Sequence, residues 1–309
     1  MDELKALQLN HSDINGGAGR AAYRIHHALR DAGVDSTMLV NVANAGDSTV
    51  QEARSMTSEF VASLRALASR QVVLRLRTHY QVLRSAAILP SGWVNQLNDF
   101  DADVIHLHWI ANEMLSIADI GRIEKPIVWT LHDMWAFCGA EHYTEDFRWR
   151  EGYRRDNRPE HEFGIDLNRL TWQRKCKHWQ RSMHIVTPSH WLADCVRESA
   201  LLRDWPVSVV PNCLDTERWQ PLEQGLARKL LSLPADVPLL LFGAMGGVHD
   251  PRKGFDLLVD ALEYLRGEIP RMELVVLGQL APRNPPNLGF PVHYTGHLHD
   301  DLSLRALYS

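Results

Sequence analysis

The chain contains little cysteine, and its cysteines follow no familiar pairing pattern. Its four cysteines are widely and irregularly spaced, with no C-x-x-C pair: Cys138, Cys176, Cys195 and Cys213. Such spacing argues against a disulfide framework. The spacings between cysteine and histidine also match structural zinc sites poorly, so no structural metal is expected.

Long apolar runs and targeting signals are also absent. No apolar run reaches the roughly 18 residues that a membrane-spanning helix needs. The first residues, from Met1 to Lys5, lack the basic and then apolar pattern of a secretory signal. We therefore expect a cytoplasmic protein with reduced thiols.

The chain has no excess of positive charge. Lysine and arginine number 33 against 38 aspartates and glutamates, which gives a net charge of -5. This balance argues against nucleic-acid binding through bulk positive charge. With 309 residues, 45% of them hydrophobic, the chain is long enough for roughly two domains and a core that needs no disulfide or metal.

Strands and helices are expected to alternate along the chain, which is typical of an α/β protein with parallel sheets. Apolar runs predict strands at residues 4–9, 37–41, 103–109, 127–131, 184–187 and 207–210 in a first half, and at 239–242, 273–277 and 292–295 in a second. Helical spacing predicts helices at 18–32, 191–199, 255–265 and 302–308. The best boundary lies at 211–222, giving domains 1–212 and 213–309. The second half has fewer strands than the five or six of a complete doubly wound sheet, so we expect it to be incomplete.

Residues 60–89 form an apolar stretch that carries arginine but no acidic residue. Its apolar residues fall close to one helical stripe. One interpretation is an ordinary amphipathic helix that packs on the first domain with a solvated arginine face, and this is slightly favoured. The other is a helix that lies on an anionic membrane surface.

A glycine-rich turn follows the first predicted strand. The segment from Gly17 to Ala22 fits G-x-G-x-x-A between a strand and a helix, a pattern that lets backbone N–H groups approach phosphate. A nicotinamide site is disfavoured, because the preceding loop is long and the second strand ends at Asn41 without the acidic residue that holds ribose. The remaining alternative is a glycine turn that serves only chain geometry.

A second turn, from Asp250 to Asp256, carries Arg252 and Lys253 beside a predicted helix start. It follows a predicted strand and a glycine-rich loop that begins at Gly243. Two cations at a helix N-terminus can hold a diphosphate, because the helix dipole and both side chains act on the same oxyanions. The alternative is a solvated basic turn that caps the helix.

Seven motifs occur in an order typical of one family: the segments at 16–21, 103–109, 130–135, 188–192, 210–215, 252–258 and 277–278. By these motifs the chain resembles glycosyltransferase family 4, the retaining nucleotide-sugar transferases of the GT-B fold. The stretch from His132 to Trp135 is most similar to transferases that build exopolysaccharide or capsule repeats.

The resemblance implies two Rossmann-like domains that face a cleft. The acceptor would bind to residues 1–212 and the nucleotide sugar to the partial domain 213–309. Lys253 matches the family's diphosphate-binding lysine. The family often has an arginine where this chain has Ala244, and Arg252 is our candidate to supply that charge. The family's later Glu-x7-Glu region has no counterpart before Ser309, so we expect a truncated chain.

Loss of a nucleoside diphosphate builds negative charge on the leaving oxygen, so fixed positive charge is the expected catalytic aid. The candidate catalytic residues are His132, Arg252 and Lys253. The candidate donor-binding residues are Gly17, Gly243, Arg252 and Lys253, and the candidate acceptor-binding residues are Gly16, Gly17, His108 and Asp133. An N-cap role for Asp133 is equally consistent with its position. No general base is assigned, and no metal or cofactor is expected.

The sequence therefore predicts a retaining glycosyltransferase that moves a sugar from a nucleotide sugar to a hydroxyl of a glycan or lipid-linked acceptor. Cell-surface polysaccharide synthesis is the expected setting, with the protein cytoplasmic or at the inner face of the membrane. Two alternatives stay open. One is a truncated, non-catalytic protein that still binds nucleotide or acceptor, and the less favoured one is a nicotinamide-dependent dehydrogenase.

Overall fold

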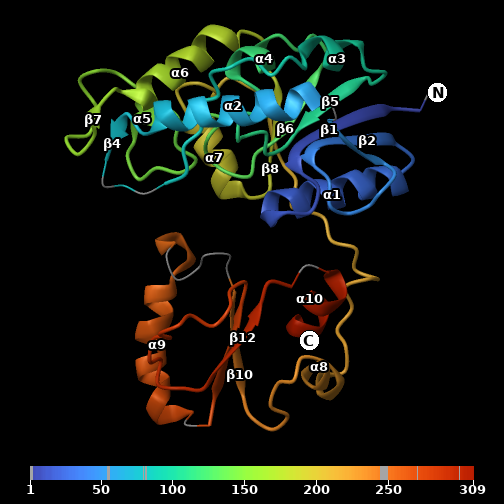
Figure 1. The fold of residues 1–309 in the computed structure, drawn as a ribbon, viewed down its shortest axis with the longest axis vertical. Helices are drawn as coiled ribbons and strands as arrows, with labels where there is room; N and C mark the ends of the chain where they lie inside the picture. Colours follow the sequence, from blue (N-terminus) through green and yellow to red (C-terminus); the bar gives the residue numbers. More distant parts are fainter. Residues whose placement is uncertain are drawn as a thin grey trace. The chain divides into compact units, whose positions relative to one another are not determined.

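A computed structural model of the chain describes residues 3–53, 56–78, 80, 82–243, 250–269, 271–298 and 300–309. The chain divides into two compact units, Met1–Cys213 and Leu214–Ser309, called unit 1 and unit 2 below (Figure 1). Each unit is described by itself.

Unit 1 is built on a sheet of seven parallel strands in the order β3-β2-β1-β5-β6-β8-β9. The strands are β1 Lys5–Ser12, β2 Asp35–Val42, β3 Val50–Glu52, β5 Val104–Leu107, β6 Ile127–Thr130, β8 His184–Thr187 and β9 Val207–Val209. On one side of β1 the next strands along the sheet are β2 and β3. On its other side they are β5, β6, β8 and β9. The carboxyl ends of β1 and β5 therefore lie at the switch point, where open α/β sheets bind ligands.

Helices cover both faces of this sheet. Helix α1, Gly16–Asp31, packs on one face, and α4, Ile117–Gly121, and α6, Leu167–His178, cover the other (Figure 1). Gly33 follows α1 with a φ of 84°, a left-handed conformation that ends helices and favours glycine. The other helices of unit 1 are α2 Met56–Val73, α3 Val94–Asp99, α5 Arg148–Glu151 and α7 His190–Glu198. A separate antiparallel pair joins β4 Leu76–Arg77 to β7 Phe163–Gly164.

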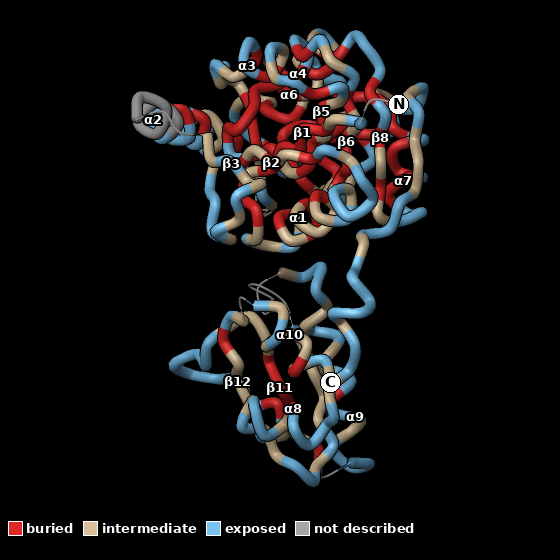
Figure 2. Tube along the Cα trace, turned by 90° about the vertical axis from the view of Figure 1, so that its right-hand side faces the viewer, coloured by how far each residue is buried: buried red, intermediate tan, exposed pale blue. Residues whose placement is uncertain are grey.

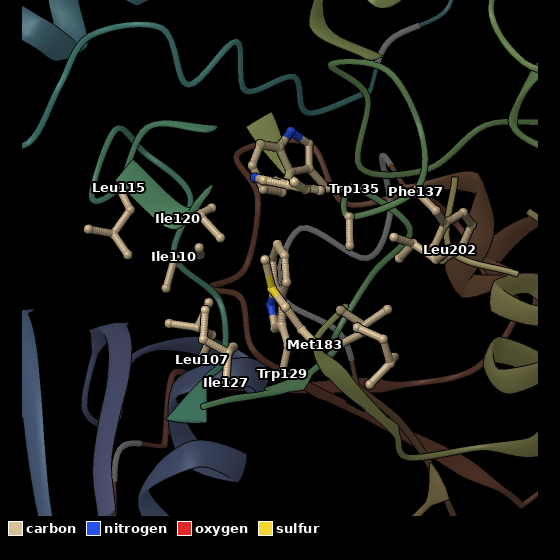
Figure 3. Packing of buried hydrophobic residues seen from close by; sticks show 14 of the residues in the cluster. Leu107, Ile110, Leu115, Ile120, Ile127, Trp129, Trp135, Phe137, Met183 and Leu202 are labelled. Carbon is tan, nitrogen blue, oxygen red and sulfur yellow. The ribbon is translucent and has the colours of Figure 1, made fainter. Parts of the chain in front are cut away.

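The core of unit 1 lies along the central strands. Figure 2 shows buried residues concentrated on β1, β5 and β6. Leu7, Leu9 and Leu107 are fully buried, as expected for parallel strands that are covered on both faces. Trp129 packs against the ring of Trp135 in the same cluster (Figure 3).

Unit 2 contains a smaller parallel sheet of β10 Leu239–Gly243, β11 Glu273–Leu277 and β12 Val292–Gly296. Helix α9, Phe255–Glu268, covers one face, while α8, Gln224–Leu230, and α10, Asp301–Tyr308, lie on the other (Figure 1). A single 3-10 turn, η1 Pro251–Lys253, precedes α9.

The predicted α/β class is confirmed, and every strand expected from the sequence appears with boundaries shifted by a few residues at most. Helix α6 lies in the polar stretch between the predicted strands 127–131 and 184–187, where no helix was predicted, because a helix with so few apolar residues carries little periodic signal.

The helical interpretation of residues 60–89 is wrong beyond Val73. After α2 the chain becomes extended, and Arg84 pairs as an antiparallel bridge with Glu141. The backbone of Ser85 also bonds to Ala140. Pairing with a distant segment therefore overrides the local helical pattern. No helix of the described residues is long and apolar enough to cross a membrane.

Candidate functional site

The glycine-rich turn lies at the carboxyl end of β1 and opens α1. Gly16 has a φ of 73°, which favours glycine there. A Cβ on Gly19 would lie 3.1 Å from the Ser12 carbonyl oxygen, so this glycine lets α1 approach β1 closely. A Cβ on Gly17 would meet nothing within 4 Å. Gly19 thus serves chain geometry, whereas Gly17 borders open space at a helix N-terminus whose first N–H groups have no partner inside the helix.

A buried aspartate holds this turn in place. The Asp13 side chain is fully buried and accepts hydrogen bonds from the backbone N–H groups of Ile14, Asn44 and Ala45, each at 2.7 Å. The turn after β1 is thereby tied to the loop after β2. The sequence analysis missed Asp13, since a polar residue in a loop gives no sign that it is buried.

Three histidines form a row where β5 and β6 end. Gln8 Oε1 lies 2.8 Å from His108 Nε2, and His108 Nδ1 lies 3.3 Å from His132 Nε2. The rings of His106 and His108 lie 4.2 Å apart, centre to centre, and are tilted by 33°. His106 Nε2 lies 2.8 Å from the Thr130 hydroxyl. The structure therefore brings together His108 and His132, which sequence analysis singled out separately.

Burial keeps this row neutral. It lowers the pKa of His106 and of His132 to about 4, and the pKa of His108 falls well below its usual value for the same reason. Neighbouring histidines act in the same direction on His106 and His108. At neutral pH the row offers hydrogen-bonding groups and no positive charge.

The Asp133 carboxylate is the meeting point of three segments. It accepts hydrogen bonds from Trp109 Nε1 at 3.0 Å, from the Trp135 N–H at 2.9 Å and from His142 Nδ1 at 2.6 Å. The second nitrogen of His142 lies 2.9 Å from the Ser85 hydroxyl. Burial acts to raise the pKa of Asp133, but His142 and the N–H donors outweigh it and lower that pKa.

A small cavity of about 10 Å³ lies among these groups, lined by residues that include His108, Trp109, His132, Asp133 and His142. It has room for about one water molecule.

A buried lysine fixes the loop that follows Asp133. Lys175, on α6, is fully buried and donates to the carbonyl oxygens of Trp135, Cys138 and Gly139. Its ammonium also lies 4.0 Å from the centre of the Trp135 ring. Burial lowers the pKa of Lys175 to about 7. Lys175 was not predicted as part of the site, because a lysine among other polar residues has the sequence signature of a solvated side chain.

Two residues of unit 1 that were expected to bind the acceptor have hydrogen-bond partners within the protein. His108 was expected to bind the acceptor, but its side chain is 2% exposed and both ring nitrogens are engaged within the protein. Asp133 was expected either to bind acceptor hydroxyls or to cap a helix. It caps no helix, and its three protein donors make it an organiser of the site. His132 keeps a nitrogen, Nδ1, that bonds to none of the described residues.

In unit 2 the basic turn is built around Asp250. Its carboxylate accepts from the Arg252 N–H at 3.1 Å and pairs with the Arg252 guanidinium at 2.7 Å. That pairing lowers the pKa of Asp250. Gly254 adopts a left-handed conformation with a φ of 66° where α9 begins. The backbone N–H of Lys253 donates to the Asp250 carbonyl oxygen at 3.0 Å. Its exposed side chain makes no hydrogen bond or ion pair with the described residues, although its charge helps to lower the pKa of Asp250.

Gly243 ends β10, and a Cβ there would lie 3.1 Å from the Leu277 Cβ. Its close approach to β11 therefore favours glycine. Ala244, the position where the resembled family often has an arginine, lies outside the described residues. In the part of the chain that is described, no three side chains of His, Cys, Asp or Glu are grouped to hold a metal ion.

Comparisons with known proteins identify a family and a fold. Residues 15–218 match the model of glycosyltransferase family 4. A crystal structure of a glycosyltransferase from Rickettsia africae matches with a TM-score of 0.53 and 13% identity, over 100% of this chain and 71% of that one. A structure of HepE from Anabaena in complex with UDP and glucose matches with a TM-score of 0.54 and 13% identity, over 99% of this chain and 71% of that one.

At such identities the likeness shows the fold alone, which is that of the GT-B glycosyltransferases. No protein of curated function matches the chain significantly.

The histidine row should make unit 1 sensitive to acid. His106 and His132 have pKa values of about 4 in the folded unit, against about 6.5 for an unperturbed histidine. Below about pH 6.5 these histidines bind protons in the unfolded chain. In the folded unit they stay unprotonated until about pH 4. Each histidine then lowers the free energy of unfolding by up to about 1.4 kcal/mol per pH unit in that window.

Urea unfolding followed by tryptophan fluorescence between about pH 7 and pH 5 measures this loss. The His106→Gln variant should show a shallower pH dependence, because one of these histidines is gone. His190→Gln is the matched control, since His190 is an exposed histidine at the start of α7. The same slope in wild type and His106→Gln would contradict the account.

Proposed function

Because the chain belongs to glycosyltransferase family 4, we propose that it transfers a sugar, with retention of configuration, from a nucleotide sugar to a hydroxyl of a glycan or lipid-linked acceptor. We assign this reaction to the synthesis of a cell-surface polysaccharide. Unit 2 is the proposed donor-binding domain and unit 1 the proposed acceptor-binding domain.

The observation that carries the proposal is the position of Lys253. This lysine lies directly before α9, in a turn on the carboxyl side of β10. Helix N-termini at that edge of a parallel sheet favour phosphate, because unpaired N–H groups and the helix dipole point toward it. The Lys253 ammonium, which forms no ion pair with the described residues, adds positive charge where the leaving diphosphate becomes more negative. The complex of HepE with UDP and glucose supports a nucleotide donor for this fold.

Arg252 is a weaker candidate for the same task. Its guanidinium pairs with Asp250, so its charge is largely compensated before any ligand binds. We therefore assign the main diphosphate contact to Lys253 and a supporting role to Arg252. Gly243 is proposed to let the nucleotide approach the end of β10.

In unit 1 the proposed contacts are polar and neutral. Gly16 and Gly17 offer backbone N–H groups at the start of α1, and His132 offers a ring nitrogen. A histidine with a pKa of about 4 is a weak base at neutral pH, so we assign His132 a hydrogen bond to a sugar hydroxyl rather than proton abstraction.

The experiment that tests this proposal measures nucleotide affinity. Lys253→Ala should weaken binding of UDP, GDP or ADP, whichever the protein prefers, by roughly tenfold, because a charge-assisted hydrogen bond to phosphate is lost. Arg252→Ala should weaken it less. Lys229→Ala, at an exposed lysine of α8, is the control and should bind as wild type does. Calorimetry that gives equal affinities for Lys253→Ala and wild type would remove Lys253 from the site.

Turnover separates the enzyme from a protein that only binds. Release of nucleoside diphosphate should depend on added acceptor, and NMR of the product should show the anomeric configuration of the donor. Nucleotide binding without transfer would favour the non-catalytic alternative. A dehydrogenase is disfavoured by the family match and by the end of β2, where Asn41 and Val42 stand in place of an acidic residue.

We further propose that the outer face of α2 and the residues after it contact an anionic membrane. Leu64, Leu67 and Leu74 are 49%, 54% and 60% exposed, and Arg70 and Arg75 are exposed beside them in the sequence. Such a mixture of apolar and basic side chains suits a surface of anionic lipid. Not all arginines of the stretch take part, because Arg65 is buried.

Co-sedimentation with phosphatidylglycerol vesicles at low salt tests this contact. Wild type should bind, and the double variant Leu64→Gln, Leu67→Gln should bind several-fold less, since apolar area available to the bilayer is lost. Leu170→Gln, at a leucine of α6 that is 44% exposed, is the control. No binding of the wild type would end the membrane proposal.

A further inference from the structure

Gln8 is a buried amide whose hydrogen bonds are incomplete. It lies in the middle of β1 with no exposed surface. Its Oε1 is 2.8 Å from His108 Nε2, whereas its Nε2 has no partner. A buried amide without all its hydrogen bonds is unfavourable compared with an apolar side chain of similar size. Its presence on a central strand therefore needs an explanation other than packing.

The contacts of Gln8 determine where the protons of two histidines lie. A carbonyl oxygen only accepts hydrogen bonds, so His108 Nε2 carries a hydrogen and donates it. A neutral imidazole has one N–H, so His108 Nδ1 is bare. That bare nitrogen lies 3.3 Å from His132 Nε2, which must then donate. The second nitrogen of His132, Nδ1, is consequently bare as well.

We propose that Gln8 is a positioning residue that, through His108, makes His132 present an unprotonated Nδ1 to the ligand. His132 Nδ1 bonds to no described residue, and His132 lines the small cavity beside Trp109 and Asp133. A bare ring nitrogen accepts a hydrogen bond from a hydroxyl but repels the oxygens of a phosphate, which only accept. The ligand group at His132 is thus a hydroxyl, and its identity as a sugar hydroxyl rests on the proposed function.

The amide orientation is what gives Gln8 this control. With the amide turned over, its NH₂ would donate to His108 Nε2, and every proton in the row would move to the other nitrogen. His132 would then present an N–H that favours phosphate or carbonyl oxygens. Both orientations leave one amide atom of Gln8 unpaired, so the positions of the protons follow from which end of the amide faces His108. In the structure that end is Oε1, at 2.8 Å.

The neutrality of the three rings supports this mechanism. Burial lowers the pKa of His106, His108 and His132, so none carries the second ring proton that would erase the difference between the two nitrogens at neutral pH. His106 lies against His108 but bonds to Thr130. The hydrogen bond of His106 is therefore separate from the two hydrogen bonds that join Gln8 to His108 and His108 to His132.

Nitrogen NMR of the wild-type protein without ligand tests the proposal directly. Long-range ¹H–¹⁵N correlations distinguish a protonated from a bare ring nitrogen. Both His108 and His132 should carry the proton on Nε2 and have a bare Nδ1. A proton on Nδ1 of His132 would overturn the proposal, and this result needs no variant.

The Gln8→Leu variant tests whether Gln8 is the cause. Without the amide oxygen, His108 loses its acceptor, and the spectra of His108 and His132 should show mixed tautomers. Thr130→Val is the matched control, because it removes the partner of His106 and leaves the row from Gln8 intact. A single, unchanged tautomer of His132 in Gln8→Leu protein with wild-type circular dichroism would overturn the proposal. If Gln8→Leu does not fold, Gln8→Asn is measured instead. Its side chain is shorter, so its amide oxygen lies too far from His108 Nε2 to accept the hydrogen bond.

These readouts are independent of catalysis. The tautomers are measured without nucleotide, so the proposal can fail while Lys253 still binds a diphosphate. Conversely, a protein that binds no nucleotide can still have the row of protons described here. Failure of this inference and failure of the proposed function are therefore distinguishable.

Discussion

The carboxylate of Asp133 is the constraint on which the candidate site of unit 1 depends. It binds Trp109 from the segment after β5, and Trp135 and His142 from the loop after β6. A buried carboxylate is stable only when its oxygens are paired. The hydrogen bonds that this one charge requires therefore fix the segments around His132. Lys175 fixes the loop after β6 as well, because its ammonium donates to three carbonyl oxygens of that loop.

The candidate site residues of the two units differ in charge. In unit 1 the ring nitrogens at the carboxyl edge are neutral because burial makes a charged histidine too costly. In unit 2 the exposed Lys253 places a positive charge just before a helix and forms no ion pair with the described residues. Glycosyl transfer requires such a difference, since the alcohol needs orientation whereas the leaving diphosphate needs positive charge.

The sequence predicted the fold better than the site. Buried parallel strands are short apolar runs, so β5, β6 and β11 were found with nearly correct ends. The end of β6 identified His132, and the G-x-G pattern identified the turn at Gly17. What the sequence could not reveal was burial of polar groups. Polar residues such as Gln8, Asp13 and Lys175 are usually exposed. Only the folded chain shows that the surrounding strands and loops bury these three side chains completely. The same limit applies to His108, whose position at the end of a strand did not reveal that its side chain is buried.

The most direct test of the account is where a nucleoside diphosphate binds. In an amide NMR titration with UDP, GDP and ADP in turn, at least one should shift the backbone signals of Phe255, Asp256 and Leu257, because their N–H groups form the first turn of α9. Those shifts should saturate together as a single binding event. Saturating shifts that leave these amides unchanged, or no shift with any of the three nucleotides, would contradict the claim that the α9 N-terminus and Lys253 hold the leaving diphosphate.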